Sequence, residues 1–152
     1  MSGTKKIVVG VDASPAGAAA LEWAVRHAEG GVVLAVSVCR MFPEVCGGGN
    51  AFHSAHRRVL HEAVEALGPM AGAQVEQAVV DGEPGPVLVE LADGADTLVL
   101  GGHQYHRGDV AVVGSVITYC VRHATCPVVV VPAGEGDDGA GARVHAVAQE
   151  FR

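Results

Sequence analysis

The chain has 152 residues, of which 49% are hydrophobic, and a formal net charge of −7 at pH 7. This length suits a single domain with a sizeable core, and the hydrophobic fraction excludes an intrinsically disordered chain. The negative charge argues against nucleic acid or an anionic membrane as the main partner. The sequence contains no run of about 20 apolar residues, so no transmembrane helix is expected.

The first half of the chain predicts two buried strands and two helices. Continuous apolar runs over residues 6–11 and 32–38 are typical of strands buried on both faces. Ser14 is a favourable N-cap residue and Pro15 suits the first helical position, so the first helix is expected to begin there and to end at Gly30. Residues 40–50 predict a flexible loop, rich in glycine.

A longer helix is expected over residues 51–70, and its two faces differ in chemistry. One face is apolar and predicted to face the core, and it consists of Val59, Leu60, Ala63, Val64 and Leu67. The opposite face is polar and carries His53, His56, Arg57, Arg58, His61, Glu62 and Glu65.

The second half of the chain continues the alternation of strands and helices. An edge strand is expected over 73–80, where Glu76 and other polar residues alternate outward. A turn over 81–86 leads into a short helix that ends at Gly94, and a fourth strand follows over 97–101. A helix that begins near Gly114 has apolar residues on one face and leads to a fifth strand over 128–131.

The last twenty residues differ in composition from the rest. Residues 133–142 are glycine, alanine and acidic residues, which predicts a flexible tail, with one weak helix over 143–151. We therefore expect one α/β domain over residues 1–132 and a tail over 133–152.

Five strands that alternate with four helices predict a doubly wound parallel sheet with helices on both faces. We expect the strand order 3-2-1-4-5, in which strand 1 lies beside strand 4. Ligands of such sheets bind outside the carboxyl ends of the strands, where the strand order reverses. The turn at Asp12 and the segment 101–113 are then expected to face one another across a crevice.

The stretch 98–115 is the strongest candidate for a ligand-binding site. It is predicted as a buried strand, a loop that bears glycine and histidine, and the start of a helix at Gly114-Ser115. Amide groups at a helix N-terminus can hold phosphate, because they and the helix dipole favour an anion. The alternative is an ordinary connection in which Ser115 caps the helix. His103, His106 and Arg107 could likewise donate to phosphate or lie in a solvated loop.

Cysteine and histidine spacing predicts no metal site. Cys39, Cys46, Cys120 and Cys126 form no CxxC pair, so we interpret them as reduced thiols of a cytoplasmic protein. His53 and His56 could chelate a metal at i, i+3, but no cysteine or carboxylate stands at a matched spacing. The remaining histidines are interpreted as surface residues: His27, His123 and His145. The amino terminus is too poor in apolar residues for a signal peptide.

Several separated motifs resemble the universal stress protein family, and together they cover residues 5–132. Residues 9–15 (Val-Gly-Val-Asp-Ala-Ser-Pro) with 19–24 resemble its first strand and helix. Gly82-Glu83-Pro84 with residues 91–101 resemble its third helix and fourth strand, and Gly114-Ser115-Val116 with residues 123–128 its last helix and strand.

The resemblance implies an adenine nucleotide, ATP or AMP, as ligand, with Mg²⁺ as a candidate companion ion. Nucleotide-binding members of the family carry Gly-x2-Gly-x9-Gly-Ser/Thr after the fourth strand. Here Gly101 and the pair Gly114-Ser115 match, whereas Gln104 stands where the family has its middle glycine. If that position requires a positive φ, glutamine costs about 1 kcal/mol or more there. If the backbone is ordinary, the Gln104 amide could itself donate to phosphate.

Carried over residue by residue, the resemblance implies a set of contacts to the nucleotide. Asp12 would bind the base or ribose, with Gly10 and Val11 beside it and Val38 against the adenine. Leu100 and Gly101 would border the ribose and phosphates, and Gly114, Ser115 and Val116 would donate to phosphate. The alternatives that involve no ligand are that Asp12 stabilises the turn through bonds to nearby backbone and that Val38 packs in the core.

The function expected from these features is that of a cytoplasmic stress-response protein that binds an adenine nucleotide and has no catalytic residues. No nucleophile stands beside a general base in a recognisable pattern. The apolar strand from Val128 to Val131 ends the sheet, and such an edge favours a homodimer. The alternatives are a nucleotide-free dimer that acts through protein contacts, which Gln104 would favour, and a weak nucleotide hydrolase.

Overall fold

The computed structural model describes residues 4–12, 15–40, 49–68, 73–102, 104–107, 110–132 and 145–147. Its centre is a parallel sheet with the order β3-β2-β1-β4-β7, so the predicted order is confirmed. These strands are β1 (Lys6–Gly10), β2 (Val32–Cys39), β3 (Gln74–Asp81), β4 (Thr97–Gly102) and β7 (Val128–Pro132). The helices between them are α1 (Pro15–His27), α2 (Gly49–Glu65), α3 (Pro84–Leu91) and α4 (Ser115–His123).

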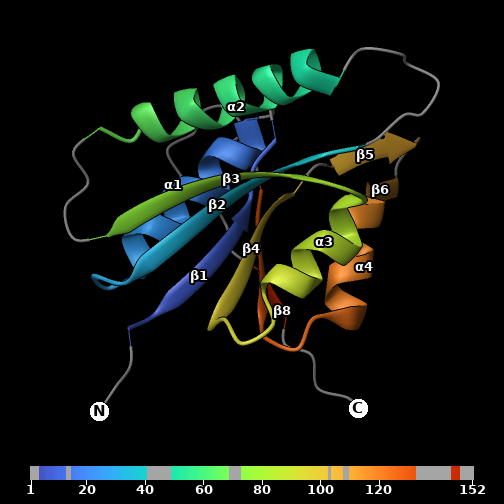
Figure 1. Cartoon of the computed structure of the whole chain (residues 1–152). Coiled ribbons are helices and arrows are strands. Elements are labelled where there is room, and N and C mark those ends of the chain that lie inside the picture. The colour runs from blue at the N-terminus through green and yellow to red at the C-terminus, as the bar shows by residue number, and fades with distance from the viewer. Residues whose placement is uncertain are drawn as a thin grey trace.

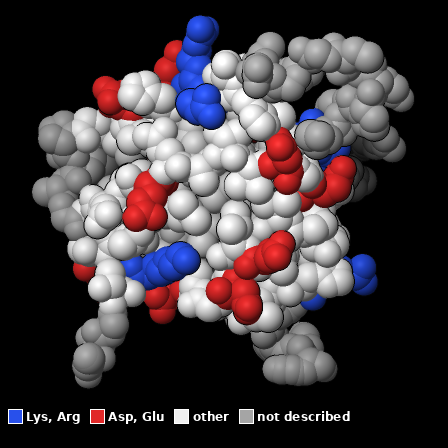
Figure 2. All heavy atoms as spheres, in the orientation of Figure 1, with Lys and Arg blue, Asp and Glu red and all other residues white. Residues whose placement is uncertain are grey.

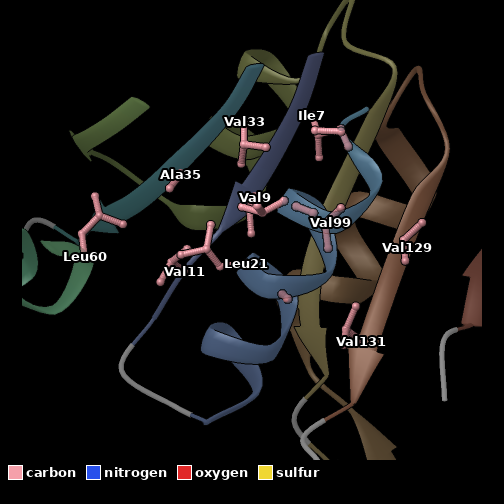
Figure 3. Close-up of a cluster of buried hydrophobic side chains, with 14 residues drawn as sticks. Ile7, Val9, Val11, Leu21, Val33, Ala35, Leu60, Val99, Val129 and Val131 are labelled. Carbon is pink, nitrogen blue, oxygen red and sulfur yellow. The ribbon is translucent and has the colours of Figure 1, made fainter. Parts of the chain in front are cut away.

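Helices cover both faces of the sheet (Figure 1). Alternate residues of β1 point to opposite faces, so Ile7 and Val9 join a core beneath α1 and α2, while Val8 joins a second core beneath α3 and α4. Figure 3 shows the first core, in which Leu21 of α1 and Leu60 of α2 meet the strand side chains. Burying each such aliphatic side chain stabilises the fold by about 1.5–3 kcal/mol.

The segment between β4 and α4 differs from its prediction as a loop. Residues Gln104–Arg107 (β5) and Val110–Val113 (β6) pair as an antiparallel two-stranded sheet of their own. The sequence carries a hairpin signal that the loop interpretation overlooked, because Gly108-Asp109 separates two short runs that contain tyrosine and valine.

The prediction of a weak helix near the carboxyl end is also wrong. His145–Val147 (β8) instead pairs antiparallel with β7, with Val128 opposite Val147 and Val130 opposite His145. Pairing satisfies the backbone groups of an apolar edge, and this gain outweighs a weak local helix preference. The edge of β7 that we expected to be open is therefore covered over Val128–Val130.

The exposed surface carries charges of both signs. Figure 2 shows Lys and Arg side chains interspersed with Asp and Glu on the face it presents. In the part of the chain that the structure describes, no helix is both long enough and apolar enough to cross a lipid bilayer.

Candidate functional site

A cavity of about 590 Å³ lies at the carboxyl ends of the central strands. The strand order reverses here, because β1 pairs with β2 on one side and with β4 on the other. The wall is formed by the ends of β1, β2 and β4, by one face of α2, by Pro84 and Leu88 of α3, and by the first residues of α4. Its volume falls within the range of about 300–1,000 Å³ that is typical of small-molecule sites.

The predicted site residues meet at this cavity. Apart from Gln104, every residue proposed from the sequence lines it: Gly10, Val11, Asp12, Val38, Leu100, Gly101, Gly114, Ser115 and Val116. The parallel pairing of Gly10 with Leu100 brings the two distant segments together. The turn after β1 and the entrance to α4 thus share one pocket, as the topology argument predicted.

Asp12 is held at the cavity rim by the residues on either side of it. The Val11 amide donates to the Val36 carbonyl at 2.8 Å, which extends the β1–β2 pairing to the last residue before Asp12. Gly17, in the first turn of α1, leaves room for the aspartate, because a Cβ there would lie 2.7 Å from Asp12 Oδ1. The carboxylate therefore lies both against the first turn of α1 and at the cavity.

The entrance to α4 presents backbone rather than side-chain groups. Gly114 is the N-cap residue and makes no side-chain capping bond, so the alternative in which Ser115 caps the helix is wrong. The first intrahelical bond of this turn runs from the Thr118 amide to the Gly114 carbonyl at 3.1 Å. The amides of Ser115, Val116 and Ile117 precede this bond and have no intrahelical acceptor.

The fold itself does not require glycine at position 114. Its φ of −66° and ψ of 157° are ordinary for any residue, and among the residues that the structure describes a Cβ there would meet no atom within 4 Å. Such a Cβ would instead project into open space beside the cavity. The glycine therefore leaves room beside the first amides of α4, which suits an anion.

Gln104 opens β5 and pairs with Val113 of β6. A paired strand residue has an extended backbone, which any amino acid adopts. The backbone penalty considered for glutamine in place of the family's glycine therefore does not arise. The Gln104 side chain lies outside the described part of the structure, as do the side chains of His103, His106 and Arg107.

The sequence analysis missed the side of the cavity that α2 forms. His56 Nδ1 lies 2.7 Å from Ser37 Oγ of β2, and both residues line the cavity together with Arg40. His53 and His56 were assigned to the polar face of α2, but both are half-buried and turned toward the sheet. Helical spacing could have revealed this, because both continue the i, i+3, i+7 stripe of Leu60, Ala63 and Leu67.

His53 belongs to a second cluster that does not line the cavity. Its Nε2 lies 2.5 Å from Asp81 Oδ1, and the buried Cys39 is close to both. Burial, and secondly the charge of Asp81, raise the pKa of the Cys39 thiol above its ordinary value. The structure thus supplies His53 with the cysteine and the carboxylate that the linear sequence did not place near it.

The thiols and remaining histidines that the structure describes lie outside the cavity. Cys39, Cys120 and Cys126 are buried free thiols. Burial, together with the nearby Cys126, raises the pKa of Cys120 to about 11, so this thiol is protonated at neutral pH. His27 and His123 are exposed, as expected; the His27 ring stacks on Trp23, and the His123 ring contacts Tyr119 in a tilted arrangement.

Known proteins match both the sequence and the fold. A family model described as the universal stress protein family matches residues 3–132. Universal stress protein Rv2623 of Mycobacterium tuberculosis is 32% identical over 138 residues, which cover 82% of this chain and 46% of that protein. The chain thus spans about half the length of the curated relatives it matches.

Solved structures give the same result. A crystal structure of a universal stress protein in complex with cAMP is 26% identical, has a TM-score of 0.60, and covers 88% of this chain and 100% of that chain. A family member from Burkholderia pseudomallei is 28% identical with a TM-score of 0.67, over 86% of this chain and 97% of that one. Sequence motifs, strand order and both kinds of comparison agree, and the chain belongs to the universal stress protein family.

Proposed function

We propose that this protein binds an adenine nucleotide, ATP or AMP, in the cavity at the carboxyl ends of β1 and β4, and that it acts through binding rather than turnover. The observation that carries the proposal is the meeting of Asp12 with the first amides of α4 at one cavity of suitable volume. A family member of 26% identity that was crystallised with cAMP supports the class of ligand.

The chemistry of the wall suggests how the ligand would lie. Val38 and Leu88 offer apolar surface to the flat faces of a base, and Asp12 can accept hydrogen bonds from its amino group or from ribose hydroxyls. The phosphates would then meet the amides at the start of α4, beside Gly114. Arg40 adds a positive charge to the wall, although Glu83 lies 4.0 Å from it.

The decisive experiment is a calorimetric titration with ATP, ADP, AMP and cAMP, each with and without Mg²⁺. A ligand present at 100 times its dissociation constant should stabilise the fold by about 2.7 kcal/mol, which a thermal shift also detects. Absence of any response at millimolar concentration would instead favour the nucleotide-free alternative, in which the protein acts through protein contacts.

A substitution at Gly114 tests the location of the site. Gly114→Val should abolish nucleotide binding and leave the far-ultraviolet circular dichroism native, because a Cβ there meets no atom of the described residues within 4 Å but occupies the space beside the α4 amides. Ala18→Val is the matched control, since Ala18 is an exposed helical residue that does not line the cavity. Retained affinity in Gly114→Val would place the site elsewhere.

Slow nucleotide hydrolysis is a second candidate, favoured by one observation. Ser37 Oγ and His56 Nδ1 form a hydroxyl–imidazole pair within the cavity wall, whereas the sequence suggested no such pair. Ser37 is only 2% exposed, so its hydroxyl serves chiefly to hold His56 in place. Steady phosphate release that Ser37→Ala abolishes would establish the hydrolase; release that persists in this variant would not involve the pair.

We further propose that the protein is cytoplasmic and forms a homodimer through β7. The described part of the chain holds three buried free thiols, which suit a reducing compartment. The apolar strand β7 suits pairing with a second copy, but β8 covers it over Val128–Val130. Dimerisation through this edge therefore requires that β8 leaves β7.

A further inference from the structure

Three potential metal ligands meet beside the ends of β2 and β3. Cys39 Sγ, a ring nitrogen of His53 and a carboxylate oxygen of Asp81 all lie within 4.8 Å of one another. The three residues come from β2, α2 and β3, so no spacing in the sequence reveals the group. None of them lines the nucleotide-site cavity, although their neighbours Val38, Arg40 and His56 do.

The fold brings the group together through two constraints. Cys39 and Asp81 are paired in the parallel register of β2 and β3, and paired residues of neighbouring strands project from the same face of a sheet. On this face α2 packs over β2, and the contact of His56 with Ser37 fixes its position. His53 lies almost one turn earlier in α2 and Cys39 lies two residues later in β2, which places this histidine above the Cys39–Asp81 pair.

The group has both a buried and an open side. Cys39 is 4% exposed, whereas the side chains of His53 and Asp81 are 35% and 45% exposed. An ion could therefore enter from solvent past the imidazole and the carboxylate and reach a sulfur that is shielded from bulk water. The short contact between His53 Nε2 and Asp81 Oδ1 brings these two potential ligand atoms together, and an ion that inserts between them would replace this hydrogen bond.

We propose that Cys39, His53 and Asp81 bind one divalent transition-metal ion of the zinc class. Thiolate, imidazole and carboxylate are the ligands that Zn²⁺ and Co²⁺ accept, whereas Mg²⁺ prefers oxygen ligands alone. Metal–ligand bonds of about 2.0–2.3 Å separate tetrahedral ligand atoms by about 3–4 Å, which small side-chain rotations supply here. When the ion binds, the Cys39 thiol proton passes to the buffer, and the proton between His53 Nε2 and Asp81 Oδ1 moves to Nδ1 of the imidazole or to the buffer. A water molecule completes the fourth position.

Cobalt spectroscopy on the reduced, metal-free full-length chain tests this proposal. One equivalent of Co²⁺ should give a thiolate-to-cobalt charge-transfer band together with the visible bands of tetrahedral cobalt. Zn²⁺ should abolish these bands by displacement, and a large excess of Mg²⁺ should leave them unchanged. Absence of the charge-transfer band at one equivalent, or its loss to Mg²⁺, would overturn the proposal.

Variants assign the ligands. Cys39→Ser should remove the charge-transfer band, and His53→Gln and Asp81→Asn should each weaken binding at least tenfold. The matched controls are Cys126→Ser, a buried thiol elsewhere, and His61→Gln, an exposed histidine on the same helix, and both should bind cobalt as the unaltered chain does. Unchanged binding in the three ligand variants would overturn the proposal.

A measurement on the apo form separates ligand loss from misfolding. Metal-free variants should retain native circular dichroism, and the rise in melting temperature that Zn²⁺ gives the unaltered chain should disappear in the ligand variants. A rise that persists in all three would place the ion elsewhere. Metal binding is tested independently of nucleotide binding, because none of these measurements involves a nucleotide.

Discussion

Gly101 lies so close to Ala16 that a Cβ on residue 101 would come within 2.6 Å of both the carbonyl carbon and the carbonyl oxygen of Ala16. The first turn of α1 packs against the end of β4 at this contact, next to the cavity. Gly101 therefore has a packing role in addition to any contact with a ligand. Gly114 contrasts with it, because a Cβ there would meet none of the described atoms within 4 Å.

This contrast predicts that alanine destabilises the fold at Gly101 but not at Gly114. Gly101→Ala should lower the free energy of unfolding by about 1–3 kcal/mol, because the new methyl group meets backbone atoms that cannot rotate away. Gly114→Ala should change it by less than about 0.5 kcal/mol. Urea denaturation of both variants measures the difference, and equal stability of the two would show that α1 moves away without cost.

The glutamine in the family motif gives a second prediction. Gln104→Gly should tighten nucleotide binding, because it restores the family's residue and removes a side chain from the segment that leads to α4. It should also cost about 0.5–1 kcal/mol of stability, since glycine weakens a strand. Calorimetry measures the affinity, and weaker binding would show that the glutamine side chain is itself a ligand of the nucleotide.

The buried thiol of Cys120 gives a prediction for alkaline pH. Its pKa of about 11 in the folded protein exceeds the ordinary value of 9.0, so the unfolded chain loses this proton at lower pH than the folded one. Its contribution to stability is therefore complete below pH 9 and should fall by roughly 2–3 kcal/mol as the pH rises to 11. Urea denaturation at several pH values should show a shallower decline for Cys120→Ala. An identical slope in both proteins would contradict this.

Removal of residues 133–152 tests the roles assigned to the tail and to β7. The α/β domain over 1–132 should stay folded, and loss of β8 should expose the β7 edge from Val128 to Val130. We therefore expect more dimer in the truncated protein than in the full chain at equal concentration, as measured by light scattering after gel filtration. A truncated protein that stays monomeric would argue against β7 as the dimer edge, and an insoluble one would show that the tail packs on the domain.

The sequence predicts the central fold well because its signals are local and strong. The apolar runs of β1 and β2, Pro15 at the start of α1 and the apolar face after Gly114 all agree with the structure. The order of these strands then follows from right-handed connections and the family resemblance. The meeting of Asp12 and Gly114 is a consequence of that order, so most of the cavity wall was predictable.

The remaining features depend on contacts between distant residues. β8 forms because an apolar edge is available, which the residues His145–Val147 do not reveal by themselves. The approach of His53 to Cys39 and Asp81 depends on the rotation of α2 and on the register of β2 with β3. The contact of His56 with Ser37 depends on the same rotation. The helical stripe of Leu60, Ala63 and Leu67 indicates this rotation, so the α2 side of the cavity was missed although the sequence carries a signal for it.

The residues that line the cavity come from two parts of the chain, 10–59 and 84–117. A molecule seated between them would hold these parts together and would have to leave before they separate. Its occupancy would lengthen the life of the folded chain in the presence of proteases. The amount of this protein in a cell would then follow the concentration of the molecule it holds.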